Sequence, residues 1–170
     1  NQNKAMKFLN HWGLKKVSSG LFGANYTCAD NTEVKLRHYK NKGLPRAIQA
    51  GSTIREVVWG VQRQNDLNKI EKELSKDRKV RILKDKSLRT ADDMGLGIGF
   101  RSSRRKELDP EPLLFNMPGR ITRVDKRAKF YDRAEPLTIS HIVFGVPDCK
   151  VIEKFYGRIG FVATDRYYSD

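Results

Sequence analysis

The residue with the clearest chemical potential is His141, which interrupts an apolar run near the end of the sequence. The run reads TISHIVFGV from Thr138 to Val146, and the alternation of a strand would place Ile139, His141 and Val143 on one face. A neutral imidazole in apolar surroundings is unfavourable unless a partner takes its lone pair, and a divalent metal ion is one such partner. A hydrogen bond inside a core is the other, so the residue types alone leave both roles open.

The other residues capable of acid–base, thiol or phosphate chemistry form no comparable pattern. His11 lies in a helical stretch and His38 in the basic stretch KLRHYK, and both are expected at the surface. Cys28 and Cys149 have neither metal-type nor disulfide-framework spacing, so with no secretion signal we expect free thiols in a reducing cytoplasm. The glycines of GLGIG, residues 95–99, precede neither a helix start nor a Lys-Ser/Thr pair, which rejects a phosphate-binding loop.

The strongest feature of the composition is its positive charge. The chain has 170 residues and a formal net charge of +14, which would suit nucleic acid, an anionic membrane surface or an anionic substrate. The basic residues are spread along the chain without zinc-finger spacing, an RNA-binding aromatic strand or a heptad, so we favour a solvated basic surface over nucleic-acid binding. No apolar run could cross a bilayer and no signal peptide is visible, which favours no membrane partner and a cytoplasmic location.

An internal repeat organises the sequence around His141. TIREVVWGV (Thr53–Val61) aligns without a gap beneath TISHIVFGV (Thr138–Val146), with five identities in nine positions and Glu56 opposite His141. A third copy enters late, because KFLNHWGL at the N-terminus overlays KFYGRIGF near the C-terminus. Agreement of strand, helix and glycine together favours three copies of one unit over a chance similarity of apolar strands.

Each copy is predicted to contain a buried strand, an amphipathic helix and short antiparallel strands. In the last copy Pro147 and Asp148 suit a helix start, and apolar residues recur at three- and four-residue steps until Gly160. The stretch QNDLNKIEKELSK supplies the same apolar stripe in the middle copy.

This organisation predicts an α+β fold made of tandem βαβββ units. Residues 1–101 are expected to form two paired units, of which the first lacks its first strand. Residues 102–136 are predicted to be a basic, proline-containing linker, and residues 137–170 the start of a second, incomplete pair. Thr53–Val61 and Thr138–Val146 are both predicted strands. Sheet edges left open by the missing strands favour self-association.

A tandem βαβββ arrangement with HIVFGVPDCKVIEKFYGRIGF (His141–Phe161) opening a new copy resembles the vicinal oxygen chelate superfamily. Its members include glyoxalases, bleomycin-resistance proteins and extradiol ring-cleaving dioxygenases. The resemblance is most specific over His141–Phe161 and looser over Lys7–Arg101. A basic linker after a first pair of units is most similar to the two-domain extradiol dioxygenases, in which the second pair carries the metal.

The resemblance implies a role for each residue of the His141 face. In the superfamily, a histidine on the first strand of a metal-bearing unit is a metal ligand, so His141 is implied to be one ligand, with Ile139 and Val143 in the cavity wall. Glu56 is implied to be the relic of a non-catalytic copy. Two histidines and a carboxylate would hold Fe(II), or Mn(II) as the alternative. No histidine follows His141, so the chain resembles one truncated at both ends, without the metal and inactive.

The implied function of the complete protein is that of an oxidoreductase, an extradiol-type dioxygenase that cleaves a catechol-like aromatic compound. Its partners would be a small aromatic substrate and O₂. One alternative is a non-catalytic protein of the same fold that binds a drug or a small aromatic molecule. A basic nucleic-acid-binding module is a less favoured alternative.

Overall fold

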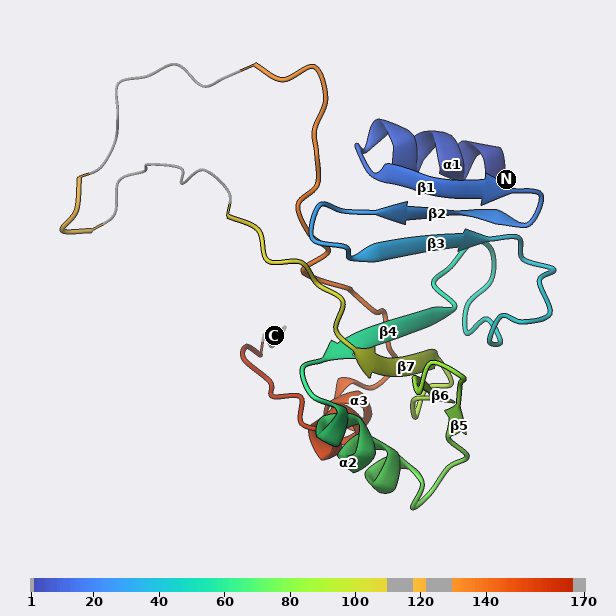
Figure 1. Ribbon diagram of the computed structural model, residues 1–170. Helices are drawn as coiled ribbons and strands as arrows, with labels where there is room; N and C mark the ends of the chain where they lie inside the picture. Colours follow the sequence, from blue (N-terminus) through green and yellow to red (C-terminus); the bar gives the residue numbers. More distant parts are fainter. Residues whose placement is uncertain (1, 110–117, 122–129, 167–170) are drawn as a thin grey trace. The chain divides into compact units, whose positions relative to one another are not determined.

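The computed structural model describes residues 2–109, 118–121 and 130–166. Within these residues the chain is of mixed α+β class, with three helices and two small sheets (Figure 1). It divides into two compact units, each described by itself below. Unit 1 comprises Asn1–His38 and Arg105–Ser140, and unit 2 comprises Tyr39–Arg104 and His141–Asp170. The α+β class predicted from the sequence is therefore confirmed.

Unit 2 contains a four-stranded sheet in which the first and last strands are neighbours. The elements are β4 (Glu56–Val61), α2 (Gln64–Leu74), β5 (Arg81–Ile82), β6 (Leu88–Ala91) and β7 (Gly97–Ser102). Their order across the sheet is β4-β7-β6-β5, with β4 parallel to β7 and the other pairs antiparallel. The middle copy therefore has the order strand, helix, strand, strand, strand. Its first strand begins at Glu56, three residues later than predicted.

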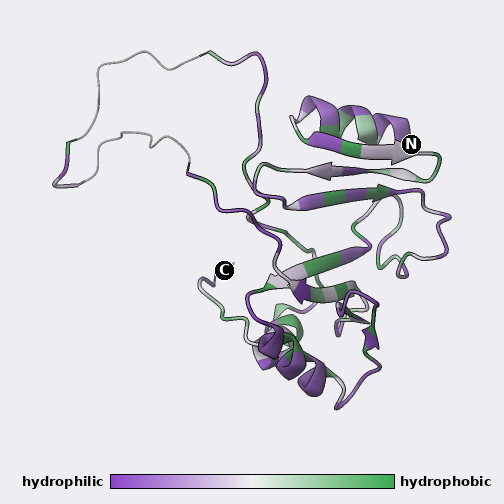
Figure 2. Ribbon diagram, in the orientation of Figure 1, coloured by the Kyte–Doolittle hydropathy of each residue, from purple (hydrophilic) through white to green (hydrophobic). Residues whose placement is uncertain are grey.

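The core of unit 2 lies between one face of this sheet and two helices. Alternate residues of β7, Ile98 and Phe100, are buried against Leu67, Ile70 and Leu74 of α2. Much of the ribbon of α2 is hydrophilic (Figure 2), as expected of a helix that buries one narrow apolar stripe. The second helix, α3, completes the core with the residues Phe155 and Tyr156.

Helix α3 (Cys149–Arg158) forms where the sequence predicts it. The side chain of Asp148 accepts hydrogen bonds from the backbone N–H groups of Lys150 and Val151, which satisfies free donors of the first turn. Gly160 follows the helix with a φ of 95°, a left-handed conformation that costs glycine little. The helix start at Asp148 and the glycine stop are therefore confirmed.

Unit 1 repeats the second part of this pattern. Helix α1 (Gln2–His11) precedes β1 (Lys15–Gly20), β2 (Gly23–Thr27) and β3 (Glu33–Arg37), which form an antiparallel sheet in the order β1-β2-β3. Its core consists of Leu9, Leu14, Ala24, Tyr26 and Cys28. Both cysteines are free, Cys28 buried and Cys149 exposed.

The segment around Thr138 corrects the strand prediction for the third copy. Residues 138–146 contain neither helix nor strand. The carbonyls of Pro136 and Leu137 accept hydrogen bonds from residues 29 and 30, but the N–H of Ile139 donates to the side-chain hydroxyl of Thr32. A side-chain acceptor takes the place of the ladder partner there, so no backbone ladder forms. The prediction that Thr138–Val146 is a strand was therefore wrong.

The predicted linker, residues 102–136, lies partly in unit 1. The Arg105 guanidinium donates to Asp30, and Arg133 donates to the carbonyls of Asn10 and Leu14. Residues 110–117 and 122–129 of the linker, and the last four residues of the predicted second pair, lie outside the described residues.

Candidate functional site

His141 and its two predicted neighbours do not lie in one compact unit. Ile139 is half-buried in unit 1, where it packs against the core, whereas His141 and Val143 belong to unit 2. His141 is exposed, and 87% of Val143 is exposed. The proposed roles of His141 as a metal ligand and of Ile139 and Val143 as cavity wall stay predictions.

The described residues do not by themselves supply a facial triad. Among them, no group of three or more histidine, cysteine, aspartate or glutamate side chains is arranged to hold a metal ion. His141 offers a single imidazole, whereas a site with open positions for substrate needs about three protein ligands. No chemical step through a bound Fe(II) or Mn(II) can therefore be derived from these residues.

The position of Glu56, opposite His141 in the repeat, has a defined geometry. Glu56 starts β4, and its Oε1 atom lies 3.3 Å from Nε of Arg89 on β6. Both side chains are largely covered, with 29% of Glu56 and 15% of Arg89 exposed. The carboxylate of Glu56 is therefore paired with the guanidinium of Arg89.

Glycine at position 99 makes room for the Arg89 side chain. Gly99 lies opposite Arg89 in the β6–β7 pair, and a Cβ atom there would lie 2.7 Å from Nη1 of Arg89 and 2.8 Å from the carbonyl oxygen of Leu88. Any larger residue would displace the guanidinium. Gly99, one of the glycines that could suggest a phosphate loop in the sequence, instead allows a charged side chain to lie close to the sheet.

A cavity of about 290 Å³ lies at this ion pair in unit 2, at the lower end of the range for small-ligand sites. Its lining combines apolar residues with three basic side chains and has no nucleophile next to a general base. Eight residues line it: Lys42, Gly43, Leu44, Pro45, Glu56, Arg81, Arg89 and Thr90.

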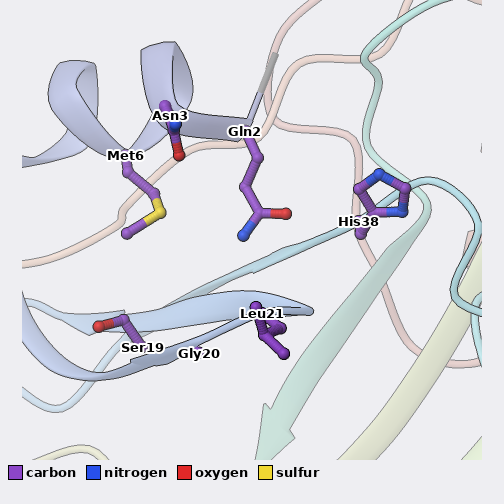
Figure 3. Close-up of a pocket in the computed structure, with 7 residues that line it drawn as sticks. All are labelled: Gln2, Asn3, Met6, Ser19, Gly20, Leu21 and His38. Carbon is purple, nitrogen blue, oxygen red and sulfur yellow. The ribbon is translucent and has the colours of Figure 1, made fainter.

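A second, wider groove lies in unit 1 and has an approximate volume of 660 Å³. Figure 3 shows side chains of α1 facing the turn between β1 and β2, with His38 at one end. The residues that line it are Gln2, Asn3, Met6, Ser19, Gly20, Leu21 and His38. Amides, one hydroxyl and one imidazole can form hydrogen bonds, but the groove contains no carboxylate to orient the imidazole as a base.

Two buried carboxylates were not anticipated from the sequence. Burial opposes ionisation of Asp30, but hydrogen bonds from Thr32, Thr138 and Arg105 lower its pKa to about 2. Asp92 accepts from the backbone N–H groups of Met94 and Leu96, and from the hydroxyl of Tyr156 at 3.3 Å. Both carboxylates hold turns in place and neither faces a described cavity. They are structural residues.

The burial of Tyr156 has a consequence for its acidity. Desolvation, and then the negative charge of Asp92, raises the pKa of the Tyr156 hydroxyl far above its usual range. Tyr156 is therefore a neutral hydrogen-bond donor at physiological pH.

The comparisons with known proteins assign no family. No protein-family model matches this sequence, and no curated protein shows significant similarity to it. Among the described residues, no helix has both the length and the apolar character needed to cross a membrane. The function must therefore be argued from the two units themselves.

Proposed function

We propose that this chain is part of a protein of the vicinal oxygen chelate superfamily, and that the complete protein is a metal-dependent extradiol-type dioxygenase. The observation that carries the proposal is the element order of unit 2. The series β4–α2–β5–β6–β7 is the βαβββ order expected of the superfamily, and α1–β1–β2–β3 repeats it without the first strand. Helix α3 adds support, because it starts after Asp148, where the third copy of the repeat predicts a helix.

The proposed reaction is the cleavage of a catechol-like ring next to its hydroxyl groups by O₂. His141 would contribute one ligand to the Fe(II) or Mn(II) ion, and the described residues alone do not complete the set of three. Cationic side chains on the surface would attract an anionic aromatic substrate, because the net charge is +14.

A second candidate function is binding of a small molecule without chemistry. The Glu56–Arg89 ion pair favours it for unit 2, since a guanidinium already neutralises the carboxylate that would be the metal ligand in this copy. Under this alternative the fold would hold a small aromatic or drug-like molecule and leave it unchanged.

The test is turnover by the full-length protein. The protein would be loaded anaerobically with Fe(II), or in a second arm with Mn(II), and then given a panel of catechols and oxygen. We expect a ring-cleaved product from the parent, and loss of both metal and product in His141→Ala. His11→Ala is the matched control, because His11 is an exposed histidine on α1.

Two results would decide against the dioxygenase. A His141→Ala protein that binds metal and turns over as the parent does would remove His141 from the site. Binding of catechols by the metal-loaded parent with no ring-cleaved product would favour the non-catalytic alternative.

A further inference from the structure

Unit 2 concentrates positive charge around the 290 Å³ cavity. Arg81 of β5 and Arg89 of β6 are directly opposite each other in the antiparallel pair. Like charges in directly opposite positions destabilise a strand pair unless something of opposite charge lies between them. Lys42 adds a third cation to the lining.

A single carboxylate faces these three cations in the cavity lining. Glu56 pairs with Nε of Arg89, and Nη1 of Arg89 donates to the carbonyl oxygen of Leu88 at 2.8 Å. Within the described part of the chain, the side chains of Arg81 and Lys42 have no ion pair and no hydrogen bond. The formal charge of the lining is therefore three cations less one anion, or +2.

A neighbouring carboxylate responds to the same positive charge. The pKa of Asp85, in the turn between β5 and β6, is lowered first by hydrogen bonds from Ser87 and then by the charges of Arg89 and Arg101. Arg89, one of the lining cations, thus also acts on the turn that joins β5 and β6.

We propose that the cavity lined by Lys42, Arg81 and Arg89 binds a small doubly charged oxyanion. A phosphate group or a dicarboxylate would match the charge of +2. Guanidinium groups bind the oxygens of both in a two-pronged manner, and a lysine adds a mobile point charge. An anion between Arg81 and Arg89 would also remove their mutual repulsion. This inference does not depend on the proposed dioxygenase function.

The experiment is a calorimetric titration of the 170-residue chain with inorganic phosphate, and in a second arm with succinate. Ionic strength is held constant with sodium chloride. We expect saturable binding with one site per chain for at least one of the two anions. The two arms show whether the cavity binds a phosphate group or a dicarboxylate.

Three variants test the location of the site. Arg81→Gln should weaken binding roughly tenfold or more, because it removes charge-assisted hydrogen bonds. Lys84→Gln removes the same charge from the same hairpin but lies outside the lining, so it should change the affinity less than about twofold. Glu56→Gln removes the only carboxylate of the lining and should tighten binding. Circular dichroism of each variant checks that it remains folded.

Two outcomes would overturn the proposal. One is the absence of saturable binding of either anion by the parent. The other is an equal loss of affinity in Lys84→Gln and Arg81→Gln, which would indicate attraction to the general positive charge of the chain.

Discussion

Replacement of Asp30 by asparagine should destabilise unit 1 in a way that depends on pH. Asp30 is 5% exposed and lies in the turn before β3. Its carboxylate accepts from the N–H of Thr32 at 2.9 Å, from the hydroxyl of Thr32 at 2.7 Å and from Nε of Arg105 at 2.8 Å. Thr138 forms a further hydrogen bond to it. One carboxylate therefore connects this turn to two segments far away in the sequence.

The magnitude follows from the acidity of the group. Its pKa falls from an ordinary value of 3.8 to about 2 in the folded protein, and one pKa unit corresponds to about 1.4 kcal/mol. The ionised carboxylate thus adds about 2 kcal/mol to the free energy of unfolding. Because the folded pKa is the lower one, this stability is present above about pH 4 and is lost as the pH falls toward 2.

The assay is urea denaturation of the parent and Asp30→Asn, followed through the amide NMR signals of Tyr26 and Cys28 in the core of unit 1. At pH 7 we expect the variant to be less stable by about 2 kcal/mol, and near pH 2 the difference should almost vanish. Glu33→Gln, at an exposed position of the same unit, should change stability by less than about 0.5 kcal/mol. A difference between parent and Asp30→Asn that stays constant from pH 7 to pH 2 would refute the reasoning.

Three further predictions concern packing, backbone and association. Phe155→Ala should destabilise unit 2 by about 3–5 kcal/mol in urea denaturation, because Phe155 is 0% exposed; Val151→Ala, 40% exposed on the same helix, should cost far less. Gly13→Ala should lower the stability of unit 1 by about 2 kcal/mol or more. Gly13 has a φ of 94°, and a Cβ atom there would lie 1.9 Å from the carbonyl oxygen of Ala134. Gly20→Ala is the control, because a Cβ atom at position 20 would have no atom within 4 Å. The exposed β1 edge predicts self-association at high concentration, and a strict monomer by light scattering would contradict it.

The local features of the fold could be predicted from the sequence because they depend on neighbours in the chain. The Asp148 cap and the apolar stripe of α2 are short-range patterns, and both form as expected. The strand predicted at Thr138–Val146 has the same apolar pattern as β4 but lacks a ladder partner in the described residues. An apolar pattern predicts burial, whereas a strand also requires a neighbouring backbone with free N–H and C=O groups.

The charged sites could not be predicted because they depend on strand register and on distant residues. Asp30 and Arg105 are 75 positions apart, and nothing local in the sequence pairs them. Arg81 and Arg89 become opposite only when β5 and β6 pair in the observed register, since a shift by one residue would turn one side chain to the other face. A dispersed net charge of +14 therefore favoured a solvated surface, while the structure gathers part of it around one cavity.

The Glu56–Arg89 ion pair limits where a metal site could form. A divalent ion bound to Glu56 would displace Arg89 from its only acidic partner in the cavity lining and leave the guanidinium beside a second cation. Only 15% of Arg89 is exposed, so water would compensate little of that repulsion. Removing one partner of a largely buried ion pair costs several kcal/mol. The Glu56–Arg89 site is thus better suited to an anion than to a metal ion. The metal centre of the proposed dioxygenase would then form away from Glu56, and His141 is the residue around which to look for it.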